Sequence, residues 1–316
     1  MGGGLVTTPG DHPNVAAAPA GCEPEPIGAS LEHWFATKID GEPSRALTTG
    51  LHDLDALTTG CRAGELVLIA ARPSTGTTVL GLKLARHTAI REGLPALVFS
   101  PAMSRSELLD RVVSAETGVD HDRIRNKQLT NLDQQRIRNK LPELASAPLY
   151  VEDDAPLSTE QIKATAQTYR RRNGVELIVI DAPTTGGNTT RERQVAEMSR
   201  AAKLLAKELA IPVVLTMQLN RASAQRPDPT PRLDDLGKVE SLDAHQVWLL
   251  HRPEFGATTE QLNRGPEAHR LGELRIIVAH NRGHQTGDRW FRFLGHRQDI
   301  LDAARPERAA SCFPTW

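Results

Sequence analysis

The sequence predicts an α/β fold, with a mostly parallel sheet flanked by helices and extra strands at one edge. The first observation is the segment Leu66–Ala71, a short apolar run with β-branched members that is typical of a strand buried on both faces. The second is the order that follows, because strand-like runs then alternate with helix-like segments. The third is a group of strand-like runs after Asp243 with little helix between them, which we expect to extend the sheet at one edge.

Each expected element has its own signal in the chain. The strand candidates of the first part are Leu66–Ala71, Ala96–Ser100, Leu149–Glu152, Leu177–Asp181 and Val213–Met217. The helices between them are marked by capping boxes, in which Ser104 is followed by Glu107 and Ser158 by Gln161. The later strands are Gln246–His251, Leu274–His280 and Arg289–Phe293.

A turn of small residues follows the first strand and leads into a helix expected from Thr77 to Arg86. Strand, turn and helix make a phosphate cradle, because backbone N–H groups and the helix N-terminus converge on one anion. The usual sequence is G-x-x-x-x-G-K-[ST], in which the lysine reaches the phosphates and the hydroxyl holds Mg²⁺. Thr77 occupies the lysine position here and Thr78 the hydroxyl position. The expected nucleotide-binding residues are Arg72, Pro73, Ser74, Thr75, Gly76, Thr77, Thr78 and Val79.

A second chemical feature is the apolar run that ends in Asp181. It places a carboxylate at the carboxyl end of a central strand, where the carboxylate can hold the water shell of Mg²⁺ opposite the phosphate loop. Alone the pattern is weak, because many strands end in an aspartate that caps a helix. Downstream of a phosphate loop it indicates a nucleotide-binding core. We therefore expect ATP or another NTP as the cofactor, with Mg²⁺ held by Thr78 and Asp181.

Composition narrows the class of protein. The 316 residues carry a formal net charge of −1, so no global basic field indicates nucleic-acid or membrane binding. The three cysteines are widely spaced and odd in number, which is typical of a reducing compartment. The sequence has no apolar run of about 18 residues, and its N-terminus lacks the pattern of a secretory signal. We expect a cytoplasmic protein without a membrane span.

The chain is expected to form one main domain with flanking segments. The regions are an arm rich in proline and glycine at 1–45, a main domain at 46–300 and a C-terminal tail at 301–316. Within the arm, a helix expected at 29–39 places Leu31, Trp34 and Phe35 on one face. Two interpretations stay open for this helix: it folds back on its own domain, or it docks on a neighbouring subunit.

Several short motifs carry a family resemblance. They are Thr48–Asp55, Gly60–Leu66, Ala70–Ser74, Val98–Ser100, Leu177–Asp181, Leu204–Leu209, Gln218–Arg221 and Ala279–Gly283. The turn Ala-Arg-Pro-Ser and the motif Gln-Leu-Asn-Arg are the most specific. On these residues the chain resembles the C-terminal RecA-like motor domain of DnaB-type replicative DNA helicases. The resemblance implies a RecA-like P-loop NTPase fold and a hexameric ring that hydrolyses ATP between subunits and pulls single-stranded DNA through its centre.

The resemblance also implies roles for individual residues. Thr78 matches the hydroxyl that holds Mg²⁺, and Asp181 matches the metal-binding aspartate of the catalytic site. Gln218 matches the residue that relays the phosphate state to the DNA-binding loops. Arg282 matches an arginine finger that reaches the nucleotide of the neighbouring subunit. The alternative for Arg282 is an ion pair with a carboxylate of its own subunit.

Three departures from the family pattern concern hydrolysis. Thr77 replaces the phosphate-binding lysine, which removes a charge-assisted contact of about 1.5–3 kcal/mol. Ala102 replaces the glutamate that activates the attacking water, and the loss of such a base costs about 10²- to 10⁴-fold in rate. His280 replaces a lysine next to the finger, which weakens the set of cations that stabilises the transition state. We therefore do not expect fast hydrolysis.

The two loops that face DNA in the family are also altered. The first, at 182–190, is short and uncharged, and the second, at 236–241, keeps one lysine. Backbone N–H groups can still contact phosphates, although the release of counterions would be small. Single-stranded DNA is therefore an expected partner only through local contacts.

Two functions remain as alternatives at this point. The first is a DNA-dependent ATPase that acts in replication or in a mobile element with weak hydrolysis. The second is a catalytically inactive paralogue that serves in nucleotide-gated assembly or binds a partner. The expected assembly is a hexameric homo-oligomer or a mixed ring with an active helicase. The loss of both the lysine and the glutamate favours the second alternative.

Overall fold

The structure is a computed structural model of the whole chain. It describes residues 27–28, 31, 35, 39, 46–153, 158–181, 188–219, 226, 228–236, 243–255 and 267–303, without the side chains of 188–195 and 268. The chain divides into two compact units, 1–44 and 45–316. Among the described residues, no helix is both long enough and apolar enough to cross a membrane.

In the first unit, the described apolar residues recur at every fourth position. Ile27, Leu31, Phe35 and Ile39 are 53–84% exposed, and the N–H of Ile39 donates to the carbonyl of Phe35 at 2.9 Å. This spacing places the four side chains along one face of a helix. Trp34, which the sequence places on the same face, lies outside the described residues.

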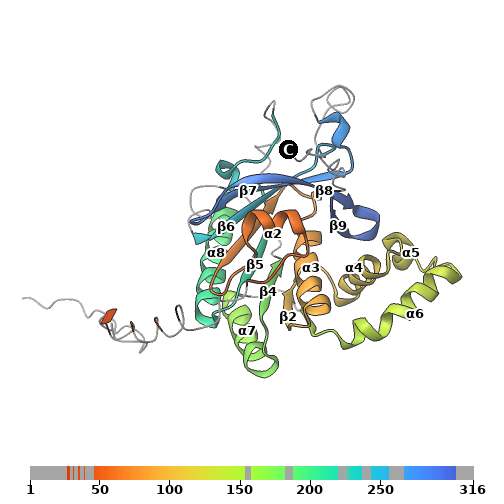
Figure 1. Cartoon of the computed structure of the whole chain (residues 1–316), viewed down its shortest axis with the longest axis horizontal. Helices are drawn as coiled ribbons and strands as arrows, with labels where there is room; N and C mark the ends of the chain where they lie inside the picture. The colour runs from red at the N-terminus through yellow and green to blue at the C-terminus, as the bar shows by residue number, and fades with distance from the viewer. Residues whose placement is uncertain are drawn as a thin grey trace, which may run out of the picture. The chain divides into compact units, whose positions relative to one another are not determined.

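In the second unit, nine described strands form one sheet in the order β3-β2-β4-β5-β1-β6-β7-β8-β9 (Figure 1). The strands are β1 (Leu66–Ala71), β2 (Ala96–Phe99), β3 (Leu149–Glu152), β4 (Leu177–Asp181), β5 (Val213–Gln218), β6 (Gln246–His251), β7 (Glu273–Asn281), β8 (Gly287–Leu294) and β9 (Asp299–Asp302). The first six strands are parallel, and β7, β8 and β9 continue the sheet in antiparallel pairs. The predicted fold class is confirmed, although the sequence pattern does not predict β9.

The α-helices of this unit include those expected from the sequence. They are α2 (His52–Thr58), α3 (Thr77–Arg86), α4 (Arg105–Thr117), α5 (His121–Arg125), α6 (Asn131–Ser146), α7 (Thr159–Asn173) and α8 (Asn188–Leu209). The predicted capping boxes are present at Ser104 of α4 and at Ser158 of α7. A third capping box joins Thr130 to Asp133 at the start of α6.

The sheet separates two apolar cores. Leu54 of α2 and Leu80 of α3 lie in the core on one face, together with Trp248 of β6. Ile162 of α7 and Leu205 of α8 lie in the core on the other face. All six residues of β1 are buried, as expected for a central parallel strand covered by helices on both sides. Because the central strands are parallel and held between these helices, their carboxyl ends and the loops that follow them lie at one edge of the sheet.

A buried ion network holds α3 in place. The Arg86 guanidinium is 3% exposed and contacts Glu116 Oε1 of α4 at 2.6 Å and Asp299 Oδ1 of β9 at 2.7 Å. Lys83 Nζ lies 3.3 Å from the same oxygen of Asp299. The helix that follows the phosphate loop is therefore tied both to α4 and to the last described strand.

Replacing Arg86 tests this network. Arg86→Met leaves the carboxylates of Glu116 and Asp299 without their buried partner, and we expect the free energy of unfolding to fall by about 3–5 kcal/mol. Arg138→Met on exposed α6 is the matched control, and its expected change is within about 0.5 kcal/mol. Urea denaturation measures both variants. Equal stability of the two variants would show that the network contributes little.

Candidate functional site

The predicted phosphate loop and Asp181 meet at one edge of the sheet. β1 and β4 are both parallel to β5, which lies between them, so the carboxyl ends of the three strands share this edge. The loop leaves β1 and enters α3, which packs across β4 and β5. Thr78, in the first turn of α3, thereby reaches Asp181 at the end of β4.

The loop backbone has the shape of an anion cradle. Ser74 has a φ of 64° and Gly76 a φ of 117°, so both residues are in left-handed conformations. A Cβ atom at Gly76 would lie 2.7 Å from Phe293 Cε2, so a side chain has no room here. Gly76 is the N-cap of α3 and provides no side-chain cap, so the first N–H groups of the helix face outward without intrahelical acceptors. Such groups favour binding of a phosphate.

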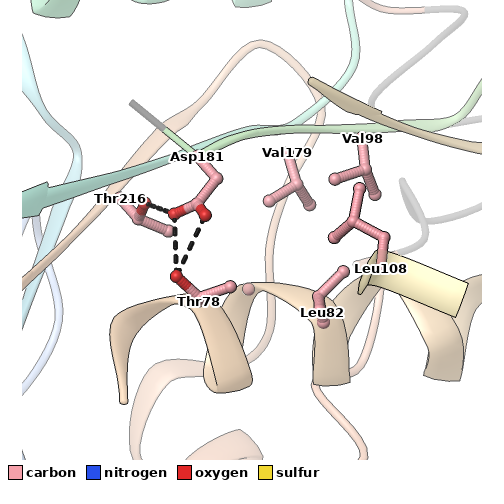
Figure 2. A pocket seen from close by; sticks show the side chains of 8 residues that line it. Thr78, Leu82, Val98, Leu108, Val179, Asp181 and Thr216 are labelled. Carbon is pink, nitrogen blue, oxygen red and sulfur yellow. Dashed lines mark hydrogen bonds between the residues drawn. The ribbon is translucent and has the colours of Figure 1, made fainter. Parts of the chain in front are cut away.

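Two threonine hydroxyls hold the Asp181 carboxylate (Figure 2). Thr78 Oγ1 donates to Asp181 at 2.9 Å from Oδ2 and 3.2 Å from Oδ1, and Thr216 Oγ1 of β5 donates to Oδ1. Burial raises the pKa of Asp181, while the two hydroxyls and the charge of Arg111 act to lower it. The apolar space behind the carboxylate is too narrow for a water molecule.

The charge around this centre differs from that of a standard phosphate loop. Thr77 brings no cation, and Arg72 Nη1 donates to the carbonyl of Phe255 at 3.0 Å. Arg111 of α4 is the cation that interacts electrostatically with Asp181, and its Nη1 donates to the Gln298 side chain. Its buried Nε has no partner among the described residues. Sequence reasoning missed Arg111, because only the tertiary structure brings this residue of α4 to Asp181.

A second group that sequence reasoning missed lies beside the phosphate loop and consists of Arg252, Phe255 and Phe293. The guanidinium of Arg252 lies between two aromatic rings, 4.0 Å from the centroid of Phe293 and 4.5 Å from that of Phe255. Phe293 is the ring that contacts Gly76. These residues come from β8 and from the segment after β6, so only the tertiary structure brings them to the loop.

The remaining candidate site residues differ in how far their side chains are exposed. Thr75 is 2% exposed and the Val79 side chain is 6% exposed, so these side chains belong to the interior. Gln218 lies beside Ala71 in the sheet register and is exposed at the same edge. Ala102 is exposed in the turn after β2. Ala102 and Gln218 therefore lie at the same edge of the sheet as the phosphate loop.

Arg282 lies at the opposite edge. It follows β7, which is antiparallel to β6, and its N–H donates to the carbonyl of His245 before β6 at 2.8 Å. A strand of this length spans about 17–20 Å, so Arg282 cannot reach the loop of its own chain. Its side chain is exposed and forms no ion pair with any described carboxylate. Burial and then the charge of Arg282 lower the pKa of the neighbouring Lys203.

The expected DNA-facing loops lie outside the described residues for the most part. This applies to 182–187 and 237–242, to Asn220 and Arg221, and to the side chains of 188–190. The structure therefore leaves their roles as predictions.

The described residues fit a nucleotide with Mg²⁺. The left-handed turn offers backbone donors to phosphate oxygens, and Thr78 with Asp181 offers the hydroxyl and carboxylate oxygens that Mg²⁺ prefers. Arg111 adds a positive charge at the same centre. The loop thus keeps its backbone donors, the Thr78 hydroxyl and the nearby Asp181 carboxylate, while the cation of the lysine is missing.

Comparison with known proteins identifies the family. The replicative DNA helicase DnaB of Leifsonia xyli subsp. xyli (strain CTCB07) is 35% identical over 287 residues, which cover 89% of this chain and 61% of that protein. The DnaB helicase of Buchnera aphidicola subsp. Acyrthosiphon pisum (strain APS) is 34% identical over 278 residues, or 85% and 58% of the two chains. The chain thus spans about three-fifths of the length of these relatives.

A solved structure and a family model agree with this result. The structure of a DnaB-like replicative helicase, described with its interactions with primase, superposes with a TM-score of 0.72 at 23% identity. The match covers 89% of this chain and 68% of that one, and it supports the same fold. The family model for the DnaB-like helicase C-terminal domain matches residues 46–302, and the resemblance predicted from the motifs is confirmed. The chain therefore belongs to the family of the DnaB-like helicase C-terminal domain.

Proposed function

We propose that this chain is a nucleotide-binding motor domain that acts on DNA in replication, in the cytoplasm, and that its own hydrolysis of ATP is weak. One observation carries the proposal. Thr78 and Asp181 are joined at 2.9 Å beside an intact phosphate cradle, while Thr77 and Ala102 replace the lysine and the glutamate. The backbone donors and the expected Mg²⁺ ligands are thus retained, while the phosphate-binding lysine and the glutamate that activates water are replaced.

Binding depends on groups that the chain already orients. Backbone N–H groups of the loop and of the first turn of α3 would hold the phosphates, and Thr78 and Asp181 would hold Mg²⁺. A bound Mg²⁺ would neutralise part of the negative charge of the phosphates. Arg111, whose charge reaches Asp181, contributes part of the missing positive charge. The Phe293 ring packs against the loop at Gly76.

Hydrolysis needs a base that this site lacks. The turn after β2 carries the methyl group of Ala102, which cannot take a proton from water. Gln218 is exposed at the same edge and can orient a water molecule without accepting its proton. The expected result is slow turnover with retained binding.

Restoring the lysine tests nucleotide binding. We expect the wild type to bind ATP in the presence of Mg²⁺ and Thr77→Lys to bind it about 10- to 150-fold more tightly, because a charge-assisted contact is regained. Titration calorimetry measures both proteins, with Asp181→Asn as the control that weakens the Mg²⁺-dependent part of binding. A wild type that binds no nucleotide at millimolar concentration would overturn the proposal.

Restoring the base tests hydrolysis separately. On the Thr77→Lys background, Ala102→Glu is expected to raise ATP turnover by about 10²- to 10⁴-fold, because it supplies a general base near the phosphate edge. Ala102→Gln has a similar shape without a basic carboxylate and is the matched control. If the two variants turn over ATP equally, the reason for weak hydrolysis lies elsewhere.

Assembly with further subunits follows from the position of Arg282. An exposed arginine on the edge opposite the loop can serve only the nucleotide of a neighbouring subunit. The exposed apolar residues Ile27, Leu31, Phe35 and Ile39 offer a face that can dock on such a neighbour. We propose a ring of identical chains or a mixed ring with an active helicase, with single-stranded DNA contacted by the loops at 182–190 and 236–241.

Complementation between subunits tests the finger. The triple variant Thr77→Lys, Ala102→Glu, Arg282→Ala has a restored site and no finger, so we expect low turnover when it is alone. Added wild-type chain supplies Arg282 in trans and is expected to raise turnover by about 10³-fold, the lower end for an arginine finger. Arg282→Ala chain added instead is the control. Equal stimulation by the two additions would exclude a role in trans.

The inactive paralogue remains a second candidate, favoured by the simultaneous replacement at positions 77 and 102. In this case nucleotide binding gates assembly or the binding of a partner. DNA-stimulated ATP turnover by the wild type that Asp181→Ala abolishes would rule this candidate out.

A further inference from the structure

The hydroxyl of Thr216 is a feature of the metal centre that the proposed function does not explain. Thr216 lies in β5, in register with Ile69 of β1 on one side and Asp181 of β4 on the other, and it is 1% exposed. Its Oγ1 donates to Asp181 Oδ1 from within the sheet. Figure 2 shows that Thr216 and Thr78 approach the carboxylate from different elements. A strand residue therefore fixes one of the two carboxylate oxygens.

The packing around Thr216 determines where its hydroxyl points. A Cβ atom at Gly81 of α3 would lie 3.2 Å from Thr216 Cγ2 and 3.2 Å from Val179 Cγ1. The methyl group of Thr216 thus faces the part of α3 that has no side chain. Because a β-branched residue is stiff at χ1, a fixed methyl group also fixes the hydroxyl. Gly81 lets α3 come close enough to β5 for this arrangement.

We infer that Thr216 is a positioning residue that holds Asp181 Oδ1 from within the sheet, so that the carboxylate stays beside Thr78 and is not free to turn both oxygens toward a divalent cation. The inference rests on the proposed binding of a nucleotide with Mg²⁺. Mg²⁺ requires compact octahedral geometry and is usually bound through one or two carboxylates and phosphates, whereas Ca²⁺ also accepts bidentate carboxylates and six to eight ligands. An aspartate whose Oδ1 is tied to a strand hydroxyl is hindered from binding a cation through both oxygens, which favours Mg²⁺ over Ca²⁺.

The pair Thr216→Val and Thr216→Ser separates the hydroxyl from the methyl group. Valine keeps the branched shape and suits a strand, so the variant is expected to fold, while it removes the donor. Serine keeps the donor. The affinity for ATP is measured with Mg²⁺, with Ca²⁺ and with EDTA. Mg²⁺ is expected to increase the ATP affinity of Thr216→Val about 10-fold less than it increases that of the wild type. The affinity in EDTA should change little, and the preference for Mg²⁺ over Ca²⁺ should be smaller. Thr216→Ser is expected to behave as the wild type does.

A double-mutant cycle shows whether Thr216 acts through Asp181. Thr216→Val is expected to have no further effect on the Mg²⁺-dependent gain when Asp181 is already replaced by asparagine. An effect of equal size in both backgrounds would indicate a general structural role and would overturn the inference. A Mg²⁺-dependent gain that Thr216→Val leaves at the wild-type value would overturn it as well.

The structure of metal-free Thr216→Val tests the positioning role without any bound nucleotide. A carboxylate that turns away from Thr78 in this variant supports the positioning role, and a carboxylate that keeps its contact with Thr78 overturns it. A wild type that binds no nucleotide would instead overturn the proposed function, and the metal-free structure would still decide the role of Thr216.

Discussion

The buried carboxylate of Asp181 is the constraint on which the site depends. A charge in this position is costly unless donors satisfy it, and its donors come from two different elements, α3 and β5. To supply them, α3 must lie close to the sheet, which Gly81 permits, and must keep its axial position, which the ion network of Arg86 secures. The phosphate loop is the connection between β1 and this fixed helix. The position of one carboxylate is thus coupled to the shape of the whole loop.

The topology of the sheet divides the function between two edges. The carboxyl ends of the parallel strands gather the loop, Asp181 and Gln218 at one edge, and the reversal of direction at β7 places Arg282 at the other. A single chain cannot bring the two together, because the length of the strands separates them. A site that needs both edges is therefore complete only between subunits. In the proposed ring, the extra antiparallel strands are the elements that would place Arg282 toward the nucleotide of a neighbouring subunit.

The elements that depend on local sequence could be predicted, and those that depend on register could not. The strand Leu66–Ala71, the capping boxes and the carboxylate of Asp181 follow from apolar runs and short-range hydrogen bonds, and the structure has them as expected. Thr216 could not be identified in this way, because in the sequence it is only one more residue of a buried strand. Its role depends on the pairing of β5 with β4. Arg111 and Phe293 likewise reach the loop from distant elements. Long-range pairing creates these contacts, and no local pattern encodes it.

The pattern of kept and changed residues has a physical logic. Thr78, Asp181 and Gly76 act through geometry: they set the shape of the cradle and the direction of its donors. Thr77 and Ala102 stand where charge and basicity are expected, and neither change disturbs the backbone, since both side chains are small. Affinity for a phosphate can survive the loss of one cation when backbone donors, Mg²⁺ and the nearby charge of Arg111 remain. Hydrolysis has no comparable set of alternative groups, because proton transfer from water needs a base at one position. In the proposed function, the change at position 77 therefore weakens binding, and the change at position 102 removes the base that hydrolysis needs.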